Sequence, residues 1–314
     1  MADRESALRS LVERPRPTIL AATAVALIAT AGLWIASLLA ARLSFPDQAG
    51  REFLFDALYY LPFVGLPVAL YGVKRPGLSA SLRLNPLPPL TTLGVFLAAM
   101  LSVYLASALD GVWAMLLNAA GLREPQVSVE IASSRALTMA VLHSAAIPAI
   151  FEELLCRGFV FSAFESRGTR LAVWVSSAIF ALMHGNVYGL PAYLLVGATS
   201  AFLVFALDSL YAGIAYHTVY NTLILLSLYL LPAADSDAVN AAPDAALISS
   251  VAVDVALAAL LMFLLLRTLD RRRRALGIEA VPRVREPLRK CEWALLAALG
   301  MVFAVTCVLV LMGV

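Results

Sequence analysis

The chain has 314 residues, of which 61% are hydrophobic and only 14% charged, and its mean hydropathy is +0.86. Because soluble domains carry about 25% charged residues, this composition excludes an ordinary soluble enzyme and predicts an integral membrane protein. The net charge is only +2, and nearly all of the 23 basic residues are arginines. Arginines beside apolar stretches set membrane topology, so we expect a lipid bilayer around the chain and no nucleic-acid partner.

A spanning helix needs about 20 mostly apolar residues. In chain order this criterion predicts about nine spans, at 17–41, 53–73, 90–120, 136–164, 171–187, 189–207, 209–231, 244–266 and 293–314. The first apolar run is longer than the roughly 7–15 residues of a signal-peptide core, so it is expected to remain as a span. The fold class is therefore all-α, a polytopic transmembrane bundle of about eight or nine helices.

Basic residues occur in alternate loops, and short cytoplasmic loops are the ones that collect Lys and Arg. They precede the first span and follow the second, fourth and eighth, whereas the loop at 233–244 is acidic. This pattern predicts a cytoplasmic amino terminus and an outer carboxyl terminus. The Ala- and Arg-rich composition favours a bacterial inner membrane. The basic residues are Arg4, Arg9, Arg14, Arg16, Lys74, Arg75, Arg83, Arg167, Arg170, Arg267, Arg271 to Arg274, Arg283, Arg285, Arg289 and Lys290.

The sequence EELLCR, at 152–157, places three charged residues inside a predicted span. Ionisable groups there cost at least about 2.5 kcal/mol each and usually face a cavity or a partner. Positions four apart share a helix face, so Glu153 and Arg157 are expected to pair, whereas Glu152 points about 100° away. Glu152 is therefore a candidate catalytic carboxylate, although the three charges could equally form a cluster that only fixes helix packing.

Two of the three histidines have a companion four residues away on the same helix face. These pairs are Phe180 with His184 and His217 with Asn221. His143 has no such companion, and we expect it to hydrogen-bond between helices. At about 1.5 Å per residue, the four candidate side chains lie roughly 12 to 20 Å from the basic end of the bundle, which favours one shared site: Glu152, His184, His217 and Asn221.

In order, the stretches EELLCRG, FALMHG and HTVYN fit the pattern EExxxR, FxxxH, HxxxN. Together they resemble the CPBP intramembrane protease family, which comprises type II CAAX prenyl endopeptidases and bacterial Abi or bacteriocin-processing proteins. The resemblance covers 136–231 and implies a catalytic core of about four helices. The rest, 1–135 and 232–314, would add transmembrane helices and a basic loop to one integrated domain.

The resemblance implies a role for each motif residue. Glu152 would activate the hydrolytic water with help from His184, and His217 with Asn221 would stabilise the oxyanion. Amide hydrolysis needs such a base and such donors. The neighbours Glu153, Arg157 and Phe180 would support the site. The implied activity is cleavage of a membrane-associated peptide or protein, with no cofactor.

Other readings of the same residues stay open. A zinc protease could use Glu152, His184 and His217 as a His2Glu ligand set with an open fourth position, although the sequence has no HExxH. Buried acids and histidines also serve ion- or proton-coupled transporters, with Asp56, Asp110, Asp208 and Asp254 as further stations, and an inactive member could act as a scaffold. The substrate, its prenylation and the oligomeric state are left open.

Overall fold

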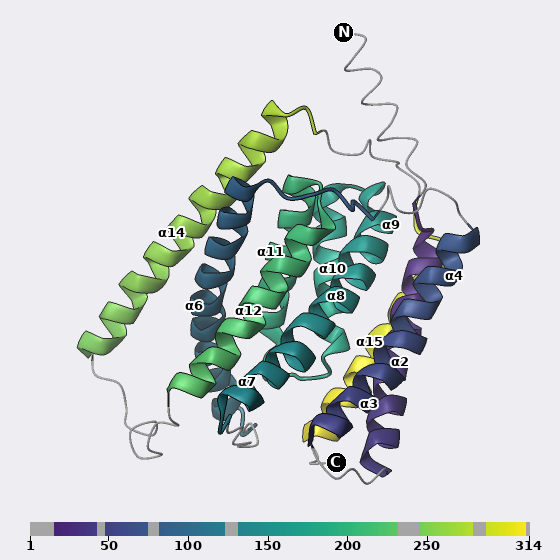
Figure 1. The fold of residues 1–314 in the computed structure, drawn as a ribbon, viewed down its shortest axis with the longest axis horizontal. Helices are drawn as coiled ribbons and strands as arrows, with labels where there is room; N and C mark the ends of the chain where they lie inside the picture. Colours follow the sequence, from purple (N-terminus) through teal and green to yellow (C-terminus); the bar gives the residue numbers. More distant parts are fainter. Residues whose placement is uncertain are drawn as a thin grey trace.

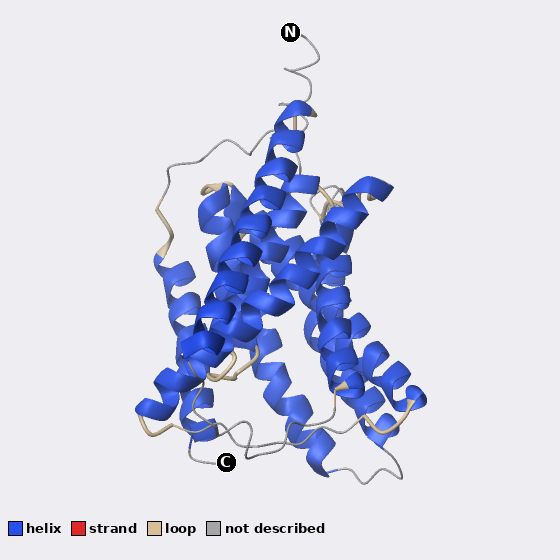
Figure 2. Ribbon diagram, turned by 90° about the vertical axis from the view of Figure 1, so that its left-hand side faces the viewer, coloured by secondary structure: helices blue, strands red, loops and turns tan. Residues whose placement is uncertain are grey.

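A computed structural model describes residues 16–42, 48–74, 82–122, 131–231, 245–278 and 287–311, and within them the regular structure is entirely helical (Figure 2). The all-α bundle is thus confirmed. The α-helices are α2 (Ile19–Arg42), α3 (Gln48–Tyr60), α4 (Leu66–Lys74), α6 (Pro89–Ala119), α7 (Ser134–Ala140), α8 (Ile147–Glu153), α9 (Ser162–Glu165), α10 (Thr169–Met183), α11 (Leu190–Leu207), α12 (Leu210–Leu230), α14 (Ala245–Ala275) and α15 (Lys290–Leu311).

Three short segments are π-helices, η1 (Leu61–Gly65), η2 (Val141–Ala146) and η3 (Leu154–Phe161), and they continue the neighbouring α-helices. Prolines lie in or near the first two, because Pro62 lies in η1 and Pro148 is the second residue after η2. A proline has no N–H for the carbonyl four residues earlier, so the helix must satisfy that carbonyl in another way. The third segment begins directly after Glu153.

The predicted spans correspond closely to observed helical stretches. Within the described residues, seven of these stretches are long and apolar enough to cross a membrane, so the protein is an integral membrane protein. The other two predicted spans are α10, an apolar helix of 15 residues, and α12, which has 21 residues. Polar residues at His217 and Asn221 lower the hydropathy of α12. Seven helical stretches among the described residues therefore meet both criteria, fewer than the roughly nine spans predicted from the sequence.

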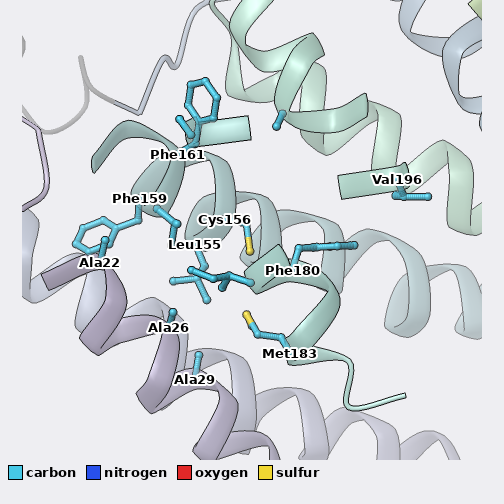
Figure 3. Packing of buried hydrophobic residues seen from close by; sticks show 14 of the residues in the cluster. Ala22, Ala26, Ala29, Leu155, Cys156, Phe159, Phe161, Phe180, Met183 and Val196 are labelled. Atoms are coloured by element: carbon cyan, nitrogen blue, oxygen red, sulfur yellow. The ribbon is translucent and has the colours of Figure 1, made fainter. Parts of the chain in front are cut away.

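The helices that carry the candidate residues lie in the middle of the bundle (Figure 1). In that view α10, α11 and α12 are flanked by α6 and α14 on one side and by α2, α3, α4 and α15 on the other. Small residues of α2 allow close packing there. Ala22, Ala26 and Ala29 face Phe159, Leu155 and Met183 of the central helices (Figure 3).

Basic residues from separate loops gather at one end of the bundle. Arg83 Nη2 lies 2.6 Å from Glu165 Oε2, and Arg83 Nε lies 3.0 Å from Asp208 Oδ1. Arg16 Nε lies 3.9 Å from the same Glu165 oxygen. These contacts place basic residues from two predicted loops on one side, as expected. Which side is cytoplasmic stays a prediction, and several predicted determinants lie outside the described residues: Arg4, Arg9, Arg14, Arg75, Arg283, Arg285 and the loop at 233–244.

Candidate active site

The two adjacent glutamates end α8 and occupy different environments. Glu153 is fully buried, whereas the side chain of Glu152 is 14% exposed. Adjacent helical residues point about 100° apart, so one carboxylate faces the bundle core and the other faces a partly open space. The split that the sequence suggested is thus present in the structure.

Glu153 is satisfied by partners from three elements. Arg157 Nη1 lies 2.8 Å from Glu153 Oε1, which confirms the ion pair expected from the spacing of four residues. His217 Nδ1 lies 3.2 Å from the same oxygen, and the Ser200 hydroxyl donates to Oε2 at 2.6 Å. A Cβ at Gly213 of α12 would lie 2.5 Å from Oε2. Only glycine therefore lets α12 approach this carboxylate so closely.

Arg157 connects this cluster to the rest of the core. Its Nη2 donates to the carbonyl of Gly197 at 2.8 Å, and its guanidinium carbon lies 4.6 Å from the centre of the Phe180 ring. Phe180 also packs against both candidate histidines, with ring centres 4.7 Å from His184 and 5.4 Å from His217. Phe180 is thus a packing surface that Arg157 and both candidate histidines share.

Glu152 contacts two residues from other elements. The Tyr60 hydroxyl donates to Glu152 Oε1 at 3.0 Å. The other oxygen, Oε2, lies 3.9 Å from Nε2 of His184. That separation is too long for a direct hydrogen bond, but one water molecule could bridge the two atoms.

The orientation of His184 is fixed by its own helix and by α11. Nδ1 lies 2.8 Å from the Phe180 carbonyl, which can only accept, so Nδ1 carries the proton. The ring stacks on Tyr193 at 4.1 Å between centres with an interplanar angle of 22°. Nε2 is therefore the acceptor nitrogen, and it is the atom that faces Glu152.

His217 and Asn221 have different partners. His217 turns Nδ1 toward Glu153, and Asn221 Nδ2 donates to the Ser144 carbonyl at 3.0 Å. In a regular helix that carbonyl would accept from residue 148, which is a proline without an N–H. Asn221 therefore satisfies a backbone group that Pro148 leaves without its usual donor. In this arrangement Glu152 pairs with His184 and Glu153 with His217, and Asn221 lies beside η2.

The zinc reading requires the three ligands to converge. Among the described residues, no group of three or more His, Cys, Asp and Glu side chains is arranged to hold a metal ion. Glu152 and His184 face each other, and His217 turns Nδ1 toward Glu153, which leaves its Nε2 for another contact. The zinc reading therefore stays an alternative that metal analysis decides.

A cavity of about 170 Å³ borders His184 on the side of α2 and α15. The hydroxyls in its wall already donate to backbone carbonyls, Thr30 to Ala26 and Thr306 to Val302, and Trp34 donates to Thr306. The rest of the wall combines the His184 ring with apolar side chains such as Leu33 and Met183. The cavity is lined by Thr30, Leu33, Trp34, Leu182, Met183, His184, Gly185 and Thr306.

The residue after His184 is under steric constraint. Gly185 has φ +61, and a Cβ there would lie 2.7 Å from Cγ2 of Thr306. Gly185→Ala is expected to lower stability by about 1 to 2 kcal/mol from backbone strain alone and to reduce activity further, because the clash displaces His184. Unfolding in detergent and peptide cleavage measure the two effects.

Gly277→Ala is the matched control for that substitution. Gly277 has a similar φ of +69, but a Cβ there would meet nothing within 4 Å. Gly277→Ala should lower stability by a similar amount through backbone strain and leave peptide cleavage unchanged. Equal activity in the two variants would contradict the inferred dependence of His184 on Gly185.

Some contacts were not expected from the sequence. Tyr60, Tyr193 and Ser200 come from outside the three motifs, and no local spacing indicated them. His143 was expected to bond between helices, and its Nδ1 lies 2.6 Å from Asp56 Oδ2. Asp56, considered earlier as a transport station, is thus a partner of His143.

Residues 134–223 match the family model for type II CAAX prenyl endopeptidase Rce1-like proteins. Over this segment, the chain is similar to the CPBP intramembrane protease family. The comparison with curated proteins and the comparison with solved structures each found no match. The matched family comprises CAAX-type membrane endopeptidases. The matched segment contains all four candidate catalytic residues, whereas α2, α3, α4, α6, α14 and α15 lie outside it.

Proposed function

We propose that the protein hydrolyses a peptide bond of a membrane-associated peptide or protein by means of a water molecule activated by Glu152 and His184. The observation that carries this proposal is the 3.9 Å separation between Glu152 Oε2 and His184 Nε2. Both atoms accept hydrogen bonds, so a water between them would donate both its protons and keep a lone pair for attack.

The proposed reaction uses the carboxylate as general base. The water oxygen attacks the carbonyl carbon of the substrate while Glu152 accepts a proton from the water, and a tetrahedral oxyanion forms. Collapse of that intermediate breaks the C–N bond, and the proton held by Glu152 passes to the leaving amine. His184 orients the water through Nε2. Such a general base typically contributes about 10² to 10⁴ in rate.

We further propose that His217 and Asn221 face the oxyanion. This role requires the imidazolium form of His217, which keeps an Nε2–H after Nδ1–H donates to Glu153, and Asn221 has a second Nδ2–H beyond the one given to Ser144. Preorganised donors of this kind are worth about 10² to 10³ each in rate. His217 and Asn221 would therefore stabilise the negative charge that develops on the carbonyl oxygen of the substrate.

Purified detergent-solubilised protein tests the reaction and its metal requirement together. The peptide library should contain prenylated CAAX peptides, bacteriocin-like leaders and the termini of membrane proteins. We expect cleavage that survives a zinc chelator, with far less than one zinc bound per chain. Stoichiometric zinc together with loss of activity on chelation would replace the glutamate mechanism with a metalloprotease. Ion flux in vesicles without any cleavage would instead support a transporter.

A further inference from the structure

Tyr60 contacts the candidate base from outside the segment that matches the protease family. It is the last residue of α3, and its hydroxyl donates to Glu152 Oε1 at 3.0 Å. The side chain is buried, with 5% of the residue exposed. Because the family match spans 134–223, it assigns no role to this tyrosine.

Ring packing holds the phenol in place. The Tyr60 ring stacks on Phe151, the residue before Glu152, with 5.2 Å between ring centres and an interplanar angle of 22°. The Tyr60 ring also contacts Tyr59, with 4.6 Å between ring centres. The hydroxyl therefore reaches Glu152 from a ring with little freedom to turn.

The hydrogen bond makes the two oxygens of Glu152 unequal. Oε1 receives the Tyr60 proton, and Oε2 is the oxygen that lies 3.9 Å from His184 Nε2. The terminal torsion of a glutamate is otherwise broad, so a carboxylate without this donor would sample other orientations. A hydrogen bond to a charged group is strong enough to select one of them.

A second contact ties α3 to the same helical stretch. Asp56, one turn before Tyr60 on the same face of α3, lies 2.6 Å from His143 Nδ1 in η2. α3 thus contacts the stretch that carries Glu152 at two places, at His143 and at Glu152 itself.

We propose that Tyr60 is a positioning residue of the active site, which fixes the Glu152 carboxylate so that Oε2 faces His184. This proposal rests on the proposed role of Glu152 as base. α3 is then part of the catalytic apparatus even though it lies outside the family segment.

Tyr60→Phe tests the proposal because it removes only the hydroxyl and keeps the stacked ring. We expect kcat to fall about 10- to 100-fold, the equivalent of one hydrogen bond to a charged group. KM should stay within about twofold, because Tyr60 acts on the base and not on substrate binding. The measurement is steady-state cleavage of the best library peptide in detergent.

Tyr216→Phe is the matched control. Tyr216 is fully buried, and its hydroxyl donates to Ser102 Oγ at 2.7 Å, so the variant also loses one buried hydrogen bond of a tyrosine. It should lose stability to a similar extent and keep kcat. A Tyr60→Phe variant with wild-type kcat, or with a rise in KM and unfolding changes alone, would overturn the positioning role.

The failure of this inference can be told apart from failure of the proposed function. Suppose that wild type cleaves the peptide and Glu152→Gln does not. Normal activity in Tyr60→Phe would then contradict only the positioning role of Tyr60. If Glu152→Gln is as active as wild type, the base itself is wrong. Should Tyr60→Phe not fold, Phe151→Leu removes the stacked ring and keeps the hydroxyl. We expect a severalfold fall in kcat at unchanged KM, and unchanged kcat would overturn the proposal.

Discussion

Glu152→Gln is expected to lower kcat by about 10² to 10⁴ without unfolding the protein. Glutamine has nearly the same shape, and its Oε1 can still accept from the Tyr60 hydroxyl, which lies 3.0 Å from that position. It cannot take a proton from water, however, so the base is lost while the packing remains. Peptide cleavage and detergent unfolding curves of the variant and of wild type measure the two consequences.

Glu292→Gln serves as the control for that substitution. Glu292 lies in the first turn of α15 and contacts Arg289, with Arg289 Nη2 2.9 Å from Glu292 Oε1. The variant removes a carboxylate from the membrane protein without touching the candidate site, so its activity should equal that of wild type. Retained activity in Glu152→Gln would remove Glu152 from the mechanism.

Arg157→Met is expected to lower the free energy of unfolding by about 3 to 5 kcal/mol, the usual cost of removing one partner from a buried ion pair. Both side chains of the pair are fully buried. The variant leaves the Glu153 carboxylate with only His217 and Ser200, and it also removes the bond to the Gly197 carbonyl. Denaturant unfolding in mild detergent measures the loss.

Two further variants make that result specific. Glu153→Gln combined with Arg157→Met should recover part of the loss, because no uncompensated carboxylate stays buried. Arg274→Met removes an arginine that pairs with Asp270 at the surface, with its side chain 69% exposed, and should change stability by no more than about 1 kcal/mol. If Arg157→Met were as stable as Arg274→Met, the buried pair would not hold the core together.

Hydropathy and short-range spacing predicted the parts of this protein that depend on local sequence. The helical stretches lie close to the expected ranges because each needs a run of apolar residues, whatever its neighbours are. The Glu153–Arg157 pair was predictable for a similar reason, since residues four apart meet on any helix. The π-helical segments were not foreseen, and Pro148 explains only why regular bonding fails beside η2.

Contacts between distant helices carry no such local signal. Tyr60 and Glu152 are separated by 92 positions, and nothing in the sequence around either residue indicates the other. Asn221 shows the same limit, because its spacing from His217 indicated a shared helix face but no partner. Its contact with the Ser144 carbonyl depends on a proline in another helix. Helix packing decided these contacts, and spacing along the chain could not.

The adjacency of the two glutamates has a consequence for how this site could be opened and closed. Glu152 directly precedes Glu153, which is held by Arg157, His217 and Ser200. The backbone that carries the candidate base therefore has little freedom to move. Turning that helix to withdraw Glu152 would pull Glu153 out of its buried cluster at a cost of several kcal/mol. Opening the site to substrate is therefore expected to move other elements, while the helix that carries both glutamates stays in place.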